Sequence, residues 1–182
     1  MVLSRPPFNK IIRSTICIAV SRPSYLTYQY SPLSIARMTK GAGKSHFAKA
    51  LERAQASTYV RINQDELKTR KKCEKICRET LQSGKTPIID RCNYNTEQRS
   101  HFLKIAKDFG IIHVNCVIFD YPRDTLIERC QKRVGHETVT SAKAGKVVNL
   151  ILGRIRHPDS KEGKSFQNVT FVRSTEESDE VV

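Results

Sequence analysis

Long apolar runs, paired metal-binding cysteines and a secretory leader are all missing from this 182-residue sequence. No run of 18 apolar residues occurs, because the longest candidate, residues 111–119, is interrupted by His113 and Asn115, and a membrane-spanning helix is therefore excluded. The six cysteines show no Cys-x-x-Cys spacing and no accompanying pair of histidines, which argues against a zinc site. We expect reduced thiols in an intracellular protein of the nucleus or cytoplasm, with no membrane partner.

Acidic residues are absent from the first 51 positions, which hold eight of the 32 Lys and Arg residues. All 18 acids lie from Glu52 onward, and the formal net charge of the chain is +14. A Ser- and Arg-containing segment without acids is typical of a mitochondrial transit peptide, although chance or a wrongly assigned gene start gives the same composition. The mitochondrion is therefore an open alternative for the location. The positive charge favours an anionic partner such as nucleic acid.

Strand-like and helix-like segments alternate along the chain with short connections. We expect strands at residues 15–20, 59–62, 86–90, 111–119 and 169–172, and helices at 44–53, 65–82, 97–109, 123–134 and 147–155. This alternation predicts an α/β fold of three layers around a mostly parallel five-stranded sheet. Residues 1–40 are expected to form an irregular basic segment, 41–173 the folded domain and 174–182 an acidic tail.

The stretch at residues 41–46 predicts a phosphate-binding loop. It reads Gly41, Ala42, Gly43, Lys44, Ser45 and His46, and we assign all six to nucleotide binding. The glycines allow the backbone to approach phosphates closely, and the helix that follows offers its positive N-terminus. Lys44 would reach the terminal phosphates, while Ser45 would place its hydroxyl on Mg²⁺. A glycine turn before a solvated lysine is the alternative interpretation.

The beginning of this Walker A pattern is incomplete. The pattern requires glycine at position 38, where the chain has Met38, and about twenty loop-like residues separate Val20 from Lys40. One hypothesis is that residues 21–38 are an unspliced or wrongly assigned insert between a first strand and the loop. Sequencing the mature transcript decides this, because a continuous coding match across the stretch contradicts the hypothesis.

Two acids lie where predicted strands end, at the edge of the sheet where α/β proteins bind their ligands. Asp65 follows the strand at 59–62, and it is either the N-cap of the next helix or a base that accepts a proton from an attacking hydroxyl. Asp90 ends the strand at 86–90, which has the form of a Walker B strand whose acid supports the metal ion.

Arg129 and Arg133 are four residues apart on a predicted helix, so they share one face. They either form a lid that neutralises charge on a transferring phosphoryl group or belong to a solvated basic face. His136 is interpreted as a surface histidine, because the sequence offers it no nucleophile.

Residues 41 to about 172 resemble the P-loop kinase domain of the polynucleotide 5′-hydroxyl kinases, including the kinase half of DNA-repair kinase/phosphatases. Within that family the resemblance is strongest to the kinase module that plants fuse to aprataxin-like domains. The stretches that carry it are GAGKS at 41–45, INQD at 62–65, LQSGK at 81–85, IIDRCNYNTEQR at 88–99 and ERCQKRVGH at 128–136. Their order and spacing together are far more specific than any single stretch.

The resemblance implies an ATP- and Mg²⁺-dependent kinase that phosphorylates the 5′-hydroxyl end of DNA or RNA, in DNA repair or RNA end processing. It gives Lys44 the phosphates, Ser45 and Asp90 the metal ion, Asp65 the role of general base, and Arg133 the role of lid arginine. Two further classes stay open: a small-molecule kinase of the same fold, and a nucleotide- or nucleic-acid-binding module without catalysis.

Three more positions are assigned by the resemblance less specifically. Arg129 is a second candidate for the lid, and Asn93 and Arg99 match positions that contact substrate or stabilise the site in the family. The Asp-x-Asp-x-Thr motif of the phosphatase half and the aprataxin histidine triad are both absent from the sequence, so neither activity is expected of it.

Overall fold

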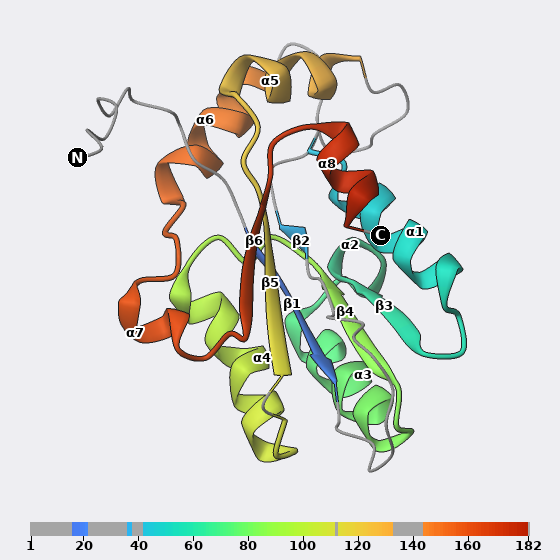
Figure 1. Cartoon of the computed structure of the whole chain (residues 1–182). Coiled ribbons are helices and arrows are strands. Elements are labelled where there is room, and N and C mark those ends of the chain that lie inside the picture. The colour runs from blue at the N-terminus through green and yellow to red at the C-terminus, as the bar shows by residue number, and fades with distance from the viewer. Residues whose placement is uncertain (1–15, 22–35, 38–41, 112, 133–143, 182) are drawn as a thin grey trace, which may run out of the picture.

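Six strands form one sheet in the computed structural model, which describes residues 16–21, 36–37, 42–111, 113–132 and 144–181 (Figure 1). The strands are β1 (Ile16–Ser21), β2 (Ala36–Arg37), β3 (Tyr59–Asn63), β4 (Thr86–Asp90), β5 (His113–Phe119) and β6 (Asn168–Val172). The order across the sheet is β3-β4-β1-β5, and β2 and β6 each pair with β5 as well.

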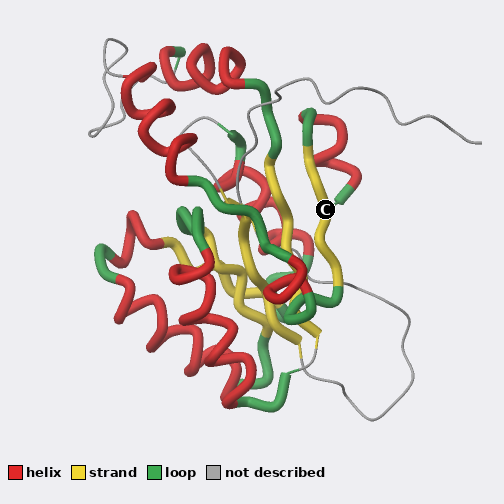
Figure 2. Tube along the Cα trace, turned by 90° about the vertical axis from the view of Figure 1, so that its left-hand side faces the viewer, coloured by secondary structure: helices red, strands yellow, loops and turns green. Residues whose placement is uncertain are grey.

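Helices lie on both sides of the sheet (Figures 1 and 2). They are α1 (Lys44–Ala54), α2 (Gln64–Leu67), α3 (Arg70–Gln82), α4 (Thr96–Asp108), α5 (Arg123–Gln131), α6 (Ala144–Arg154), α7 (Ser160–Gly163) and α8 (Thr175–Glu180). None of the helices in the described segments combines the length and the apolar character that crossing a bilayer needs.

The strands of the sheet share one direction apart from β1. β3 pairs with β4 in parallel, and β2 and β6 pair with β5 in parallel, whereas β1 runs antiparallel to both β4 and β5. The sheet therefore has six strands where five were expected, and β1 is the strand that departs from the mostly parallel arrangement. An apolar run predicts a strand, but it contains no signal for direction, which depends on the connections. The strand that leads towards the phosphate loop is the two-residue β2.

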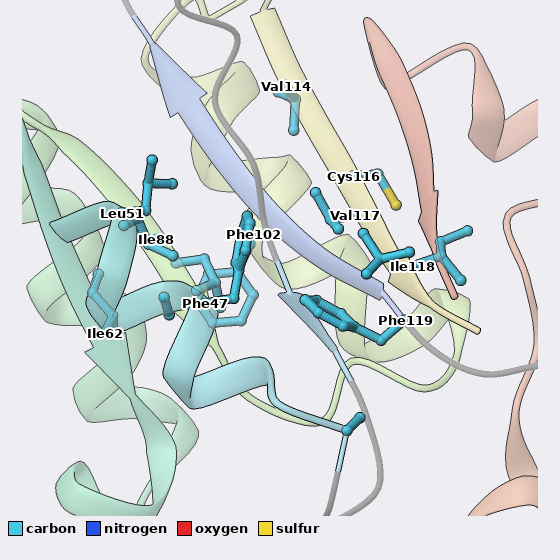
Figure 3. Packing of buried hydrophobic residues seen from close by; sticks show 14 of the residues in the cluster. Phe47, Leu51, Ile62, Ile88, Phe102, Val114, Cys116, Val117, Ile118 and Phe119 are labelled. Carbon is cyan, nitrogen blue, oxygen red and sulfur yellow. The ribbon is translucent and has the colours of Figure 1, made fainter. Parts of the chain in front are cut away.

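A cluster of buried aromatic and aliphatic side chains fixes α1 against the sheet (Figure 3). Phe47 of α1 and Phe119 at the end of β5 meet edge to face, with ring centroids 5.6 Å apart. Phe47 and Leu51 lie on the apolar face that the spacing of α1 predicts. Since Phe47 is fully buried and three residues after Lys44, this packing also fixes the first turn of α1.

The helix expected over residues 65–82 is two helices in the structure. Lys68 interrupts it with a φ of 67°, a backbone conformation that lysine rarely adopts. Each of the two helices has its own N-cap: Asn63 accepts from the backbone N–H of Glu66, and Thr69 accepts from that of Lys72.

The C-terminal third holds more helix than the sequence pattern predicts. Helix α6 begins three residues before the expected start at residue 147, and the short helix α7 was not expected. The acidic segment at the end of the chain forms α8. Asp159 caps α7 and Ser174 caps α8 through their side-chain oxygens, so both starts carry a signal that short windows of periodicity overlook.

Candidate active site

The last residues of the loop and the first turn of α1 have the conformation that an anion site needs. Gly43 is the N-cap of α1 with a φ of +83°, which glycine adopts without strain. The first turn of α1 contains no acidic residue of its own, which suits the binding of an anion at the positive end of the helix. Ala42 is buried, Lys44 and Ser45 are half-buried, and His46 is exposed. The structure does not describe residues 22–35 and 38–41, which include Met38 and Gly41.

The Lys44 and Ser45 side chains converge on Asp90, which is 45 residues further along the chain than Ser45. The Nζ of Lys44 donates to Oδ1 of Asp90 at 2.6 Å, and the Oγ of Ser45 lies 3.4 Å from the same oxygen. Helix α1 supplies the first two groups, and the carboxyl end of β4 supplies the third. The loop and the strand-end acid therefore form one group.

The second oxygen of Asp90 is held from β3. Arg61 donates to Oδ2 from Nε at 2.8 Å and from Nη2 at 2.6 Å, and Asn63 donates from Nδ2 at 2.6 Å. Burial of Asp90 by itself raises the pKa of the carboxyl, but the charges and hydrogen bonds of Lys44, Arg61 and Asn63 outweigh it and hold that pKa below its ordinary value. Asp90 is therefore an ionised carboxylate in a buried position.

Ser45 and Asp90 fit a magnesium ion. A hydroxyl and an ionised carboxylate 3.4 Å apart are hard oxygen donors of the kind Mg²⁺ prefers. In the described segments no group of three or more His, Cys, Asp and Glu side chains is placed to hold a metal ion. This agrees with the usual coordination of Mg²⁺ beside phosphates, which takes one or two protein oxygens and completes the shell with water and substrate.

Asp65 lies at the same edge of the sheet, in the first turn of α2. Asn63 pairs in register with Asp90 across β3 and β4, and α2 begins at the next residue. The Asp65 side chain is exposed. The sequence left two roles open for Asp65, the N-cap of the helix or a base. The N-cap of α2 is Asn63, so the Asp65 carboxylate is available for another role.

Of the two lid candidates, Arg129 lies among the described residues and Arg133 lies outside them. Arg129 of α5 is over the ring of Tyr121, 4.3 Å from its centroid, and its Nη2 donates to Oγ1 of Thr175 at 3.1 Å. These described contacts join α5 to the residues after β5 and to α8.

Asn93 and Arg99 are fully buried and hold the fold together. Arg99 forms an ion pair with Glu162 of α7 and donates to the backbone carbonyls of Asn93 and Arg156 at 3.2 and 2.9 Å. Of the two roles that the resemblance leaves open for Arg99, these contacts favour stabilisation of the site. A side chain with 0% of its surface exposed has no free face for a substrate.

Arg61, Asn63, Gln64 and Arg91 are site residues that sequence reasoning overlooked. Alternate residues of a strand point to the same side, so Arg61 and Asn63 share a face of β3. A charged and an amide side chain two residues apart in an otherwise apolar strand were the available signal. Arg91 follows Asp90 directly, and its Nε donates to Oε1 of Gln64 at 2.5 Å.

Residues 68–158, half of the chain, match the protein family described as AAA domain. The matched range includes Asp90 and Arg129 and begins after the GAGKS loop and Asp65. The match confirms an α/β fold of the P-loop class.

Curated relatives point to the family that the motifs resemble. Over 148 residues, 78% of this chain and 16% of the relative, the chain is 34% identical to the Arabidopsis thaliana protein named transcription factor bHLH140. It is 35% identical over 82 residues to the Acanthamoeba polyphaga mimivirus protein named putative bifunctional polynucleotide phosphatase/kinase, covering 45% of this chain and 19% of the relative. It is 38% identical over 76 residues to the Schizosaccharomyces pombe bifunctional polynucleotide phosphatase/kinase, covering 42% and 18%. The resemblance to polynucleotide kinase domains is confirmed, and the chain spans less than a fifth of each of these relatives.

Proposed function

Because the chain belongs to the AAA-domain family, we propose that it is a P-loop kinase that transfers the γ-phosphate of ATP to the 5′-hydroxyl end of a nucleic acid. The observation that carries the proposal is the convergence of Lys44 and Ser45 on the buried carboxylate of Asp90. Two relatives with polynucleotide phosphatase/kinase in their names support the choice of acceptor.

The nucleotide side of the reaction uses the loop and β4. Residues 41–46 would bind the phosphates, with Lys44 moving from Asp90 onto the terminal phosphates. Ser45 and Asp90 would hold Mg²⁺, which supplies charge neutralisation on the phosphates when it is bound. Arg61 and Asn63 bind Oδ2 of Asp90, and these bonds would keep the carboxylate ionised when Lys44 leaves.

The acceptor side uses the exposed rim at α2. Asp65 would accept the proton of the attacking 5′-hydroxyl, and Arg133, with Arg129 as the second candidate, would neutralise charge on the transferring group. Most of the rate would come from positioning and charge neutralisation, because phosphoryl transfer leaves little covalent chemistry to the protein. The net charge of +14 would bind the strand through its phosphates in either DNA or RNA.

One structural observation favours a second candidate, a nucleotide- or nucleic-acid-binding module without catalysis. The strand between β4 and β5 is the antiparallel β1, and among the described residues the strand next before the loop is the two-residue β2. Together with Met38 at the position of the first loop glycine, this arrangement would weaken the binding of ATP. Oligonucleotide binding that persists without ATP binding identifies this candidate.

The test is phosphoryl transfer by matched variants. Asp65→Ala should retain ATP binding and lose transfer to a 5′-hydroxyl oligonucleotide, because the base is removed and the loop is intact. Asp108→Ala is the control, since this exposed aspartate of α4 pairs with Arg78 at the surface. Transfer by Asp65→Ala at the rate of the control contradicts the role of Asp65. Phosphorylation of sugars or nucleosides but not of oligonucleotides identifies a small-molecule kinase.

A further inference from the structure

The helix that carries Asp65 is too short to hold its own position. Helix α2 has four residues, and a helix of that length is unstable alone because nucleation costs more than one turn returns. Lys68, the C-cap of α2, has a φ of 67°, a strained conformation that persists only where the surroundings impose it. The Asn63 cap fixes one backbone N–H at the start of α2. Contacts from other elements must therefore fix the rest.

Leu67 packs against the hydrophobic core at the end of α2, and two arginines contact the residues on either side of Asp65. Arg91 donates from Nε to Oε1 of Gln64 at 2.5 Å, and Arg61 donates from Nη1 to Oε1 of Glu66 at 2.8 Å. Asp65 lies between the two fixed residues, and its carboxylate has no hydrogen-bond or ion-pair partner within the described parts of the chain. The neighbours of Asp65 are thus held while its own side chain remains available.

Both arginines are themselves fixed by buried surroundings. The Arg61 side chain is 8% exposed, and its Nε and Nη2 bind the carboxylate of Asp90. The guanidinium of Arg91 lies over the ring of Phe102, 5.5 Å from its centroid, and its Nη1 donates to Asn93 at 3.3 Å. A planar guanidinium bonds in several directions at once, which a lysine ammonium on a flexible stem does not reproduce.

We propose that Arg61 and Arg91 are positioning residues that hold the first turn of α2, so that Asp65 stays at a fixed place beside Asp90. The inference rests on the proposed function for its kinetic consequence, because Asp65 is the base only if the chain is a kinase. Arg61 touches Asp90 and Glu66 with one guanidinium, so it couples the acid on the nucleotide side to the helix on the acceptor side. Neither arginine needs to touch the substrates.

The first test removes the acceptors of these bonds and leaves Asp90 with all its partners. In the Gln64→Ala/Glu66→Ala double variant, we expect faster hydrogen exchange at the amide of Lys68, which donates to the carbonyl of Gln64 at 2.8 Å. We expect kcat to fall by about 10- to 100-fold, because a small displacement of a reacting group has effects of that size. The KM for ATP should stay within about two-fold, since the loop is unchanged. Glu79→Ala is the control, since Glu79 forms an exposed pair with Lys75 on α3.

The second test compares Arg61→Lys with the single variant Glu66→Ala. A lysine at position 61 cannot bond Asp90 and Glu66 at once, so we expect Arg61→Lys to lose at least as much kcat as Glu66→Ala. Adding Glu66→Ala to Arg61→Lys should cause little further loss, because the contact between residues 61 and 66 is already absent in Arg61→Lys.

The inference is overturned if the double variant transfers phosphate at the control rate with unchanged exchange at Lys68. If the unaltered chain phosphorylates no oligonucleotide, the proposed function fails separately. Hydrogen exchange then decides on its own whether the arginines hold α2.

Discussion

Replacing Arg99 by methionine tests whether this arginine stabilises the fold or serves the reaction. The change removes the ion pair to Glu162 and leaves the Oγ1 of Thr96, at 2.9 Å, as a partner of a carboxylate that stays buried. The carbonyls of Asn93 and Arg156 also lose a donor. Removing one partner of a buried pair costs about 3–5 kcal/mol, which lowers the melting temperature of a domain of this size by roughly 6–20 °C.

The assay is urea and thermal unfolding of Arg99→Met, Glu162→Leu and the double variant. Each single change should lower the free energy of unfolding strongly, because it leaves an unpaired buried charge. The double change should cost much less than the sum of the two, since no charge is then left unpaired. Arg78→Met is the control: its pair with Asp108 is exposed, and its loss should cost at most about 1 kcal/mol.

Two results refute this reasoning. Strictly additive costs in the cycle mean that Arg99 and Glu162 do not stabilise the fold as a pair. If Arg99→Met leaves the free energy of unfolding unchanged but abolishes phosphoryl transfer, Arg99 has the other role that the resemblance left open, contact with the substrate.

Three further predictions follow from the described geometry. Burial alone raises the pKa of Asp90, but Lys44 and Arg61 lower it below the ordinary value. The ionised carboxylate therefore stabilises the fold at any pH above the ordinary carboxyl pKa. This contribution is lost as the pH falls through the pKa that Asp90 has in the folded chain. The unaltered chain should lose more stability than Asp90→Asn between neutral pH and about pH 3, and equal losses contradict this role. Cys73 and Cys77 should react with thiol reagents only after unfolding, since both are fully buried and burial raises the pKa of Cys77 to about 12. Fast labelling of the native chain would contradict the packing of α3. Oligonucleotide affinity should fall steeply with added salt, and a flat salt dependence argues against phosphate contacts.

Local signals predicted the elements that carry the site. The helix after Gly43 and its apolar face with Phe47 follow from glycine placement and a spacing of 3.6 residues, and the strand that ends in Asp90 follows from a short apolar run before an acid. These signals lie within short windows of sequence, so they can be read without knowledge of the fold. The family motifs added the proposed roles of Lys44 and Asp65, which periodicity alone does not give.

Long-range choices could not be predicted in the same way. The direction of β1 depends on its pairing with β5 and β4, and its apolar pattern is the same in either direction. Arg99 and Glu162 are 63 residues apart, so no local pattern joins them. The contacts of Arg61 with Asp90 and Glu66 likewise exist only after β3 and β4 pair in register.

The measurement that tests the central claim most directly is the transfer of label from γ-labelled ATP, with Mg²⁺, to an oligonucleotide with a free 5′-hydroxyl. The same strand with a 5′-phosphate is the control acceptor. We predict label on the first strand and none on the second, and loss of that label in Lys44→Ala. A folded chain that binds Mg²⁺ and ATP but labels neither strand would contradict the kinase and favour the binding module.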